Sequence, residues 1–271
     1  MTHDSQLPDA GEIEATLLEA AAAAAALTLP KFRQGIAVDN KWTTGFDPVT
    51  AADREAEIAV REVIGRRFPE HAIIGEEWDK KETGSRFAWI VDPIDGTRAF
   101  ITGVPVWGTL IGFMVDGRAT AGLMGQPFTG ELWISANGRA EYRRASDVVP
   151  LKSSPVTELA RAKLTATSPD LFRMGRDLSA PWNAINTAVL TTRYGLDCYG
   201  YCLLASGHID IVVEAGLKDV DICPLIPVIE AAGGVITTWD GGPAEAGGNC
   251  VASANAELHA AALAVINRAM G

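Results

Sequence analysis

Apolar and polar residues alternate along the first half of the chain in patterns typical of two helices and a series of strands. Between residues 50 and 68, the apolar Ile58, Val60, Val63 and Ile64 are interspersed with charged residues, which predicts a helix with one buried face. An Asp-Gly pair between two alternating runs is typical of a hairpin turn. The expected elements of this half are helices at 9–29, ending before Pro30, and from Thr50 or Asp53 to about Phe68, and strands at 72–75, 87–91, 107–115, 118–126 and 131–136.

The sequence of the second half of the chain predicts a regular alternation of strands and helices. Residues 145–158 turn to Ser, Pro and Thr, so we place a junction there between an α+β domain at 1–147 and an α/β domain at 148–271. The expected elements beyond the junction are strands at 162–167, 189–193, 209–213 and 234–238, and helices from about Asp170, at 198–206 and at 222–232.

The composition fits a globular protein and argues against a nucleic-acid-binding surface. Hydrophobic residues make up 48% of the chain and charged residues 21%, and the formal net charge is −11. The cysteines show no paired zinc spacing and are expected to be buried thiols: Cys198, Cys202, Cys223 and Cys250. The histidines stand outside every motif and are expected in surface or packing roles: His3, His71, His208 and His259.

The N-terminal apolar stretch has the features of a helix within a folded protein. Glu12, Glu14 and Glu19 precede the alanine run 20–26, whereas a signal peptide carries a basic region there. We expect no segment with the roughly 18–20 apolar residues of a membrane span. The chain is therefore expected to be cytoplasmic.

One hexapeptide carries the strongest chemical signal: Asp92-Pro93-Ile94-Asp95-Gly96-Thr97. The apolar run before it predicts a buried strand, and Pro93 is expected to prevent that strand from continuing in register. Two carboxylates held close together repel each other unless a cation lies between them, and Mg²⁺ prefers such oxygen ligands. The N–H groups of Gly96 and Thr97 would open the next helix and favour an anion. The hexapeptide therefore predicts metal ligands beside a phosphate-binding turn.

Further acidic residues lie at the ends of other predicted elements. Glu76 and Glu77 follow a short apolar strand, Asp53 lies at the start of a helix, and Asp221 precedes an apolar segment. Asp47 is expected to be a turn residue before Pro48. Any one of these acids could simply cap a helix or close a turn, and strand geometry alone does not choose between Glu76 and Glu77.

Taken in order and spacing, these segments resemble the inositol monophosphatase-like family of metal-dependent phosphatases, from about Leu17 to Trp239. The matching pieces are Gly75-Glu76-Glu77, the hexapeptide at 92–97, and the Asp221 segment that ends in Gly233-Gly234. The chain is most similar to the histidinol-phosphate phosphatase branch, on the segments 103–111, 193–199 and 212–218. It departs from that branch at Arg98, where lysine is usual.

The resemblance implies a layered α-β-α-β-α sandwich, of the inositol monophosphatase and fructose-1,6-bisphosphatase type, with the site between its halves. It implies metal ligation by Glu76, Asp92, the Ile94 carbonyl, Asp95 and Asp221. It also implies catalytic roles for Thr97, with Asp53 hydrogen-bonded behind it, and for Glu76. Two or three Mg²⁺ ions, replaceable by Mn²⁺ or Zn²⁺, would activate water and stabilise the leaving oxygen. A homodimer is implied as well.

Substrate discrimination is expected at Glu214 and Asp197. Glu214 matches the family position that contacts the leaving group, and acidic side chains suit the ammonium and imidazole groups of histidinol phosphate. The alternative for Asp197 is a helix N-cap before Cys198.

Several rival functions share this pattern. Inositol-1-phosphate is one alternative substrate, and a nucleotide or sugar bisphosphate is another, although the latter would call for a basic cluster that the motifs do not show. Haloacid-dehalogenase-type phosphatases use Asp-x-Asp-Gly-Thr with a covalent aspartate, whereas the two acids here are one residue further apart. A catalytically silent member would be expected to lack a ligand, and every carboxylate of the pattern is present.

Overall fold

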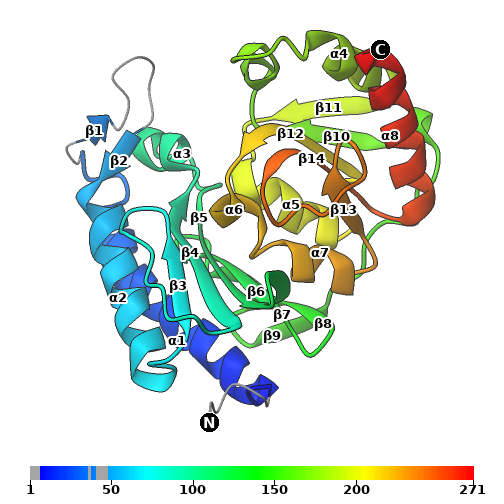
Figure 1. Ribbon diagram of the computed structural model, residues 1–271. Coiled ribbons are helices and arrows are strands. Elements are labelled where there is room, and N and C mark those ends of the chain that lie inside the picture. The colour runs from blue at the N-terminus through cyan, green and yellow to red at the C-terminus, as the bar shows by residue number, and fades with distance from the viewer. Residues whose placement is uncertain (1–6, 36–37, 41–47) are drawn as a thin grey trace.

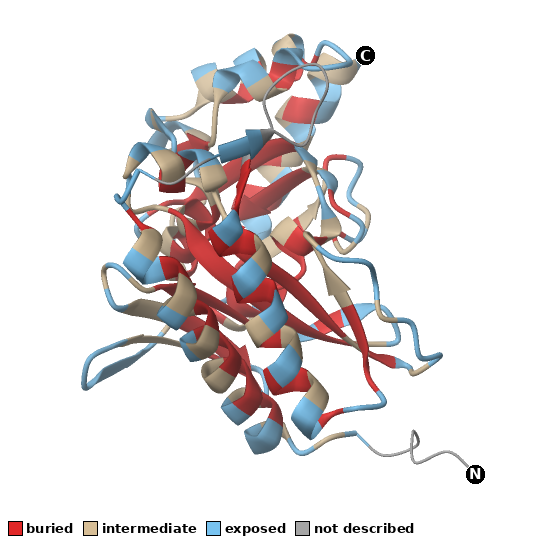
Figure 2. Ribbon diagram, turned by 90° about the vertical axis from the view of Figure 1, so that its left-hand side faces the viewer, coloured by how far each residue is buried: buried red, intermediate tan, exposed pale blue. Residues whose placement is uncertain are grey.

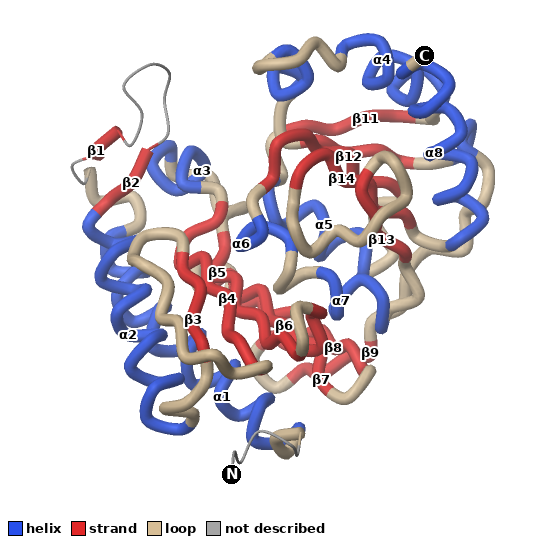
Figure 3. Tube along the Cα trace, in the orientation of Figure 1, coloured by secondary structure: helices blue, strands red, loops and turns tan. Residues whose placement is uncertain are grey.

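The chain folds into five alternating layers of helices and sheets, as Figures 1 and 3 show. The structure is a computed structural model that describes residues 7–35, 38–40 and 48–271. Helices α1 and α2 cover one face of a seven-stranded sheet. Helices α5, α6 and α7 lie between that sheet and a five-stranded sheet, whose outer face is covered by α4 and α8. The layered sandwich expected from the resemblance is confirmed.

The helices are α1 (Ala10–Thr28), α2 (Ala51–Arg67), α3 (Thr97–Thr102), α4 (Ser179–Ala188), α5 (Asp197–Ala205), α6 (Asp219–Ile222), α7 (Ile226–Ala231) and α8 (Ala256–Met270). The strands are β1 (Val38–Asn40), β2 (Pro48–Thr50), β3 (Ala72–Gly75), β4 (Phe87–Asp95), β5 (Gly108–Val115), β6 (Arg118–Gln126), β7 (Glu131–Ala136), β8 (Arg139–Arg144), β9 (Asp147–Pro150), β10 (Lys163–Ala166), β11 (Thr191–Tyr194), β12 (Ile211–Leu217), β13 (Val235–Thr238) and β14 (Gly248–Ser253).

The seven-stranded sheet runs β3 to β9 in chain order and is antiparallel except for the parallel pair β3–β4. The predicted Asp116-Gly117 turn joins β5 to β6, and both of its residues have positive φ, at 50° and 79°. The sheet continues beyond its predicted end, because β8 and β9 occupy residues that the sequence assigned in part to a domain junction. The proposed boundary between residues 147 and 148 falls within β9, and the division into two domains stays a prediction.

Helices α1 and α2 pack on the sheet through amphipathic faces, visible as mixed red and blue segments in Figure 2. Asp9 caps α1 by accepting hydrogen bonds from the N–H groups of Gly11 and Glu12. On α2, Val60 and Val63 are buried as expected, but Ile58 is 43% exposed and the charged Glu57 is fully buried in its place.

One helix, at residues 10–31, is long and apolar enough to cross a membrane by length and composition alone, a match that the sequence was not expected to contain. The buried residues of α1, among them Leu17, Ala20 and Ala24, pack in one cluster with α2 and the sheet, which favours a core helix over a membrane span.

The five-stranded sheet has the order β11-β10-β12-β14-β13 and mixes parallel and antiparallel pairs. Two predicted helices differ from those found. Residues 169–173 form only a short 3-10 turn, and the α-helix begins at Ser179. The helix expected at 222–232 is divided into α6 and α7, because Pro224 and Pro227 interrupt the hydrogen-bond ladder. Strand β14 and helix α8 were not predicted.

A close backbone contact joins the middle layer to the seven-stranded sheet. Pro224, between α6 and α7, sits against Gly122 of β6 and Gly112 of β5. A Cβ at Gly122 would lie 1.9 Å from the Pro224 carbonyl oxygen, so no larger residue fits there without displacing the middle layer. This contact fixes the height of α6, which carries Asp221, over the sheet whose strand β4 carries Asp92 and Asp95.

Candidate functional site

The strand was expected to end at residue 91, before the hexapeptide. Instead, β4 continues through a bulge to Asp95. The register against β5 shifts between Asp92 and Asp95, so Pro93 lies where no ladder hydrogen bond is required of it. The Thr109 hydroxyl donates to the Pro93 carbonyl at 2.8 Å, and the Ile94 N–H donates to Asp92 Oδ1 at 3.0 Å. These contacts pin the bulge that re-aims the two carboxylates.

The turn after the strand begins α3, as predicted. Gly96 is the N-cap residue with φ of 79°, and a Cβ there would lie 3.2 Å from both Trp107 and Asp197. The Thr97 hydroxyl donates to the Ile94 carbonyl at 3.1 Å. The hydroxyl and the carbonyl that the resemblance assigns to the site are therefore in direct contact.

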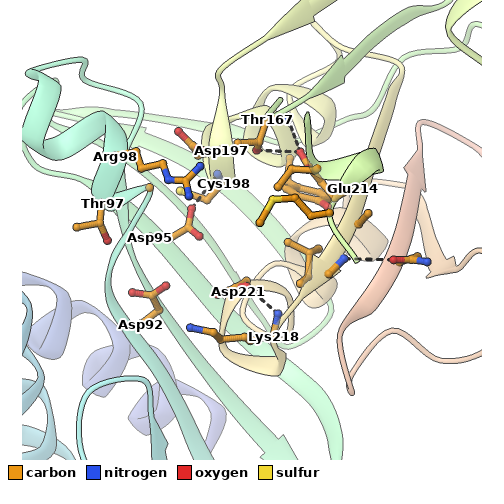
Figure 4. Close-up of a pocket in the computed structure, with 18 of the residues that line it drawn as sticks. Asp92, Asp95, Thr97, Arg98, Thr167, Asp197, Cys198, Glu214, Lys218 and Asp221 are labelled. Atoms are coloured by element: carbon orange, nitrogen blue, oxygen red, sulfur yellow. Dashed lines mark hydrogen bonds between the residues drawn. The ribbon is translucent and has the colours of Figure 1, made fainter. Parts of the chain in front are cut away.

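Three carboxylates from the two halves of the molecule converge. One oxygen from each of Asp92, Asp95 and Asp221 lies within 4.8 Å of the others. Asp221 Oδ2 accepts from the Lys218 N–H at 2.7 Å, and Asp95 Oδ2 accepts from the Cys198 N–H at 2.9 Å. Each of the three carboxylates therefore accepts a hydrogen bond from a backbone N–H, and the three lie at the same end of the cleft (Figure 4).

The electrostatics of this cluster fit a divalent cation. Burial raises the pKa of Asp92 and Asp95 well above the usual range, and repulsion from neighbouring carboxylates adds to the shift. Burial is also the main cause that raises the pKa of Asp221 to about 6. A cluster of buried carboxylates at neutral pH requires compensating positive charge, and hard oxygen donors at this spacing suit Mg²⁺ or a similar ion.

Glu76 lies at the same cluster, whereas the backbone N–H of Glu77 contacts α2. Glu76 lines the cleft, its Oε1 lies 2.8 Å from Lys218 Nζ, and its charge contributes to the raised pKa of Asp92. The Glu77 N–H instead donates to the buried Glu57. The sequence left open which of the two glutamates is the candidate metal ligand, and the geometry favours Glu76.

Asp53 is buried behind the site without lining the cleft. Its Oδ2 accepts from the N–H and the hydroxyl of Thr50, at 2.8 and 2.6 Å, in a capping box at the start of α2. Among the described residues, no hydrogen bond joins Asp53 to Thr97, contrary to what the resemblance implied. Burial raises the pKa of Asp53, with a smaller contribution from Glu76. Asp47 lies outside the described residues.

The cluster opens into a cleft of about 440 Å³ between the two halves. Its lining includes all the predicted metal ligands, Gly96, Thr97, Asp197 and Glu214. It also includes three basic residues, Arg98, Arg176 and Lys218, although the sequence showed no basic cluster. Lys218 is paired with Glu76, and the charge of Arg98 acts on Asp197, so part of this positive charge is compensated.

Glu214 lies on the wall of the cleft opposite the metal-ligand cluster. Its Oε1 accepts from the N–H and the hydroxyl of Thr167, at 2.7 and 2.9 Å. Its Oε2 and the Tyr201 hydroxyl are buried and have no hydrogen-bond partner among the described residues. Burial raises the pKa of Glu214 to about 8. An orphaned carboxylate oxygen of this kind is suited to a polar or cationic group entering the cleft.

Asp197 is the first residue of α5 and not its N-cap, which is Leu196. The side chain that accepts from the first turn of α5 is Asp95, through the Cys198 N–H. Asp197 has a φ of 45°, and burial raises its pKa to about 6, although a hydrogen bond with the Thr167 side chain and the charge of Arg98 both lower it. The alternative role as a helix cap is therefore wrong, and Asp197 faces the cleft.

Thr167, Tyr201 and Lys218 contribute to the site but were not predicted. Thr167 follows the end of a strand, which is the one local signal that could have drawn attention to it. The four cysteines are buried free thiols, as predicted. His71 and His259 are buried and hydrogen-bonded within the core and His208 is exposed, also as predicted; His3 lies outside the described residues.

Comparison with known proteins extends the match over the whole chain. The model of the inositol monophosphatase family matches residues 9–270. A histidinol-phosphatase of Chlorobaculum parvum is 34% identical over 239 residues, covering 88% of this chain and 90% of that protein. The bifunctional phosphatase IMPL2, chloroplastic, of Arabidopsis thaliana is 45% identical over 198 residues, 72% of this chain, which spans only 56% of the plant protein.

Among solved structures, an inositol monophosphatase from Zymomonas mobilis matches with a TM-score of 0.84 and 34% identity. That match covers 96% of this chain and all of the other. The predicted family and the predicted enzyme class, a metal-dependent phosphatase, are both confirmed by these matches. The chain belongs to the inositol monophosphatase family.

Proposed function

We propose that this protein is a Mg²⁺-dependent phosphomonoesterase that hydrolyses L-histidinol phosphate to L-histidinol and phosphate, as a step of histidine biosynthesis. The observation that carries the choice of substrate is the wall opposite the carboxylate cluster, where Glu214 Oε2 is buried and unpaired and Asp197 faces the same cleft. A leaving group with an ammonium and an imidazole would satisfy both acids. The match to a histidinol-phosphatase along most of both chains supports the same substrate.

The proposed metal ligands are Glu76, Asp92, the Ile94 carbonyl, Asp95 and Asp221. Two or three Mg²⁺ ions, with Mn²⁺ or Zn²⁺ as substitutes, would supply positive charge that acidifies the attacking water and balances the charge of the transferring phosphoryl group. The bulge at Pro93 and the backbone donors to Asp95 and Asp221 would hold the carboxylates in place before substrate arrives.

The residues around the phosphate would orient it for in-line attack. The N–H groups of Gly96 and Thr97 open α3 and would donate to phosphate oxygens. The Thr97 hydroxyl, now donating to the Ile94 carbonyl, would accept from the attacking water in the same position. Asp53 would act at a distance, through the start of α2 and its charge near Glu76, since it lies behind the cleft. Preorganised donors of this kind lower the barrier because they need no rearrangement during the reaction.

The deciding experiment compares kcat/KM for histidinol phosphate, myo-inositol 1-phosphate and a 3′,5′-bisphosphate nucleotide, all with saturating Mg²⁺. A preference of at least about 100-fold for histidinol phosphate is expected, since a buried charged hydrogen bond discriminates by about 1.5–3 kcal/mol and two acids line the pocket. Equal rates, or a preference for inositol phosphate, would move the protein to the alternative supported by the Zymomonas mobilis structure. A preference for the nucleotide would indicate that the arginines in the cleft lining, Arg98 and Arg176, determine the choice of substrate.

We further propose a cytoplasmic homodimer that acts on a small phosphomonoester and has no nucleic-acid or membrane partner. The net charge of −11 supports the lack of a nucleic-acid partner. Light scattering coupled to size exclusion tests the dimer, and a monomer mass at micromolar concentration would contradict it.

A further inference from the structure

We propose that Glu57 and Arg61, on the sheet-facing side of α2, are positioning residues for the metal ligand Glu76. The inference rests on the proposed function, because it takes Glu76 to bind metal. Neither residue lines the cleft. They act through the backbone of the segment that carries Glu76, which has no regular secondary structure after β3 ends at Gly75.

The two side chains form a clamp on the residues that follow Glu76. Glu57 is fully buried, and its Oε2 accepts from the Glu77 N–H at 2.7 Å. Its Oε1 accepts from Arg61 Nε, also at 2.7 Å. Arg61 in turn donates to the Trp78 carbonyl at 3.1 Å. One buried carboxylate and one guanidinium thus bind the backbone of the two residues that directly follow the proposed ligand.

The residue before Glu76 is fitted to the same clamp. A Cβ at Gly75 would lie 1.9 Å from Glu57 Oε1, so the carboxylate occupies space that any other residue at 75 would fill. On the other side, the Glu76 N–H donates to the Val91 carbonyl of β4 at 3.2 Å. Glu76 is therefore fixed from β4 on one side and from α2 on the other, within two residues in each direction.

A purely structural role does not explain why this position holds a charge. Burying a carboxylate costs several kcal/mol in principle, and a buried ion pair can often be replaced by apolar residues without loss of stability. The apolar positions of α2 already pack on the sheet, and Ile58 is left exposed next to the buried Glu57. What only the carboxylate provides is an acceptor for the Glu77 N–H and a partner that aims Arg61 at Trp78.

Positioning contacts behind a metal ligand typically change metal affinity by about 10- to 100-fold. We therefore expect Glu57→Leu, which removes the acceptor but keeps the bulk, to raise the Kd for Mn²⁺ by about 10- to 100-fold. The Mg²⁺ concentration for half-maximal activity should rise in parallel, with kcat largely recovered at saturating Mg²⁺. Glu57→Gln keeps one acceptor oxygen for the Glu77 N–H but turns an NH₂ group toward Arg61, so its loss should be smaller than that of Glu57→Leu and larger than that of a surface variant.

The test measures Mn²⁺ binding to the full chain by electron paramagnetic resonance of the free ion, with no substrate present. Thermal unfolding of each variant is recorded alongside. Glu55→Leu is the matched control, because Glu55 lies on the same helix but is exposed and pairs with Lys31. If Glu57→Leu does not fold, Arg61→Met loosens the clamp at Trp78 alone and should weaken Mn²⁺ binding to a smaller degree.

The outcomes separate the inference from the proposed function. Wild-type Mn²⁺ affinity in folded Glu57→Leu or, failing that, in Arg61→Met would overturn the positioning role. An equal loss in Glu57→Gln and Glu57→Leu would overturn it too, because the acceptor would then not be what matters. If the wild-type chain binds no Mn²⁺, the proposed metal site itself is refuted. Weakened binding in Glu57→Leu, a smaller loss in Glu57→Gln and wild-type binding in Glu55→Leu support the clamp.

Discussion

The substitution Glu214→Gln tests the proposed substrate most directly, because glutamine cannot acquire the negative charge that a bound cation would stabilise, and the volume hardly changes. Glu214 Oε1 is held by both donors of Thr167, and an amide oxygen can accept the same two hydrogen bonds. The change therefore acts at Oε2, the buried oxygen without a partner, which becomes an NH₂ group. The metal ligands and the phosphate-binding turn keep their contacts.

The expected magnitude follows from the interaction that is lost. A hydrogen bond between a cationic group and a buried carboxylate is worth about 1.5–3 kcal/mol, which corresponds to about 10- to 150-fold in kcat/KM. The ammonium of histidinol phosphate would then face the NH₂ group, which adds a repulsive contact at the same place. Because the contact is made equally before and during phosphoryl transfer, most of the loss is expected in KM.

The assay compares histidinol phosphate with p-nitrophenyl phosphate, whose leaving group carries no cation, at saturating Mg²⁺. The ratio of the two kcat/KM values should fall by about 10- to 150-fold in the variant. Thr167→Val removes one donor to Oε1 but keeps the acid, so it should change the ratio less than Glu214→Gln does. A loss of equal size on both substrates would refute the reasoning, since Glu214 would then support the metal site or the fold and not the leaving group.

Three further predictions concern the carboxylates and the strand that presents them. Asp95→Asn should lower kcat/KM by at least about 100-fold, because a ligand is lost, yet stay folded, since its amide oxygen still accepts from Cys198; full activity would disprove the metal assignment. The metal-free protein should lose stability as pH rises from about 4.5 to 8, because Glu214 with a folded-state pKa of about 8 binds a proton that the unfolded chain releases. Saturating Mg²⁺ should reduce that slope in thermal melts, since metal binding requires ionised carboxylates, and a stability that rises with pH in EDTA would contradict the prediction. Thr109→Val should cost about 1–3 kcal/mol in urea unfolding and weaken Mg²⁺ binding, because the Pro93 carbonyl at the bulge loses its donor; Thr109→Ser should restore both.

The parts of the site that lie close together in sequence were predictable, and those assembled across the fold were not. The hexapeptide puts two acids, a carbonyl and a hydroxyl within six residues, so composition and spacing alone indicated its chemistry. Thr167 reaches Glu214 across 47 positions, and Glu57 reaches Glu77 across 20. No local pattern links such pairs, because tertiary packing alone brings them together.

The fold shows the same limit at particular elements. Pro93 would normally exclude a strand, but a bulge accommodates it and β4 continues to Asp95. Strand β9 consists of exposed residues, so it lacks the alternation that marks a half-buried strand. The burial of Glu57 with Ile58 exposed reversed the expected face at that point of α2, because hydrogen bonds to the Glu76 segment outweighed hydrophobicity there.

The contact of Pro224 with Gly112 and Gly122 has an evolutionary consequence. Because backbone meets backbone, a side chain at 122 cannot be absorbed by a change of rotamer, and would lift Asp221 away from Asp92. In a deep mutational scan, Gly122 should therefore tolerate substitution as poorly as a metal ligand, although it touches neither metal nor substrate. Glu214 lies on β12 of the other sheet, away from this contact. Substrate preference can thus diverge among related sequences while the spacing of the carboxylates is inherited unchanged.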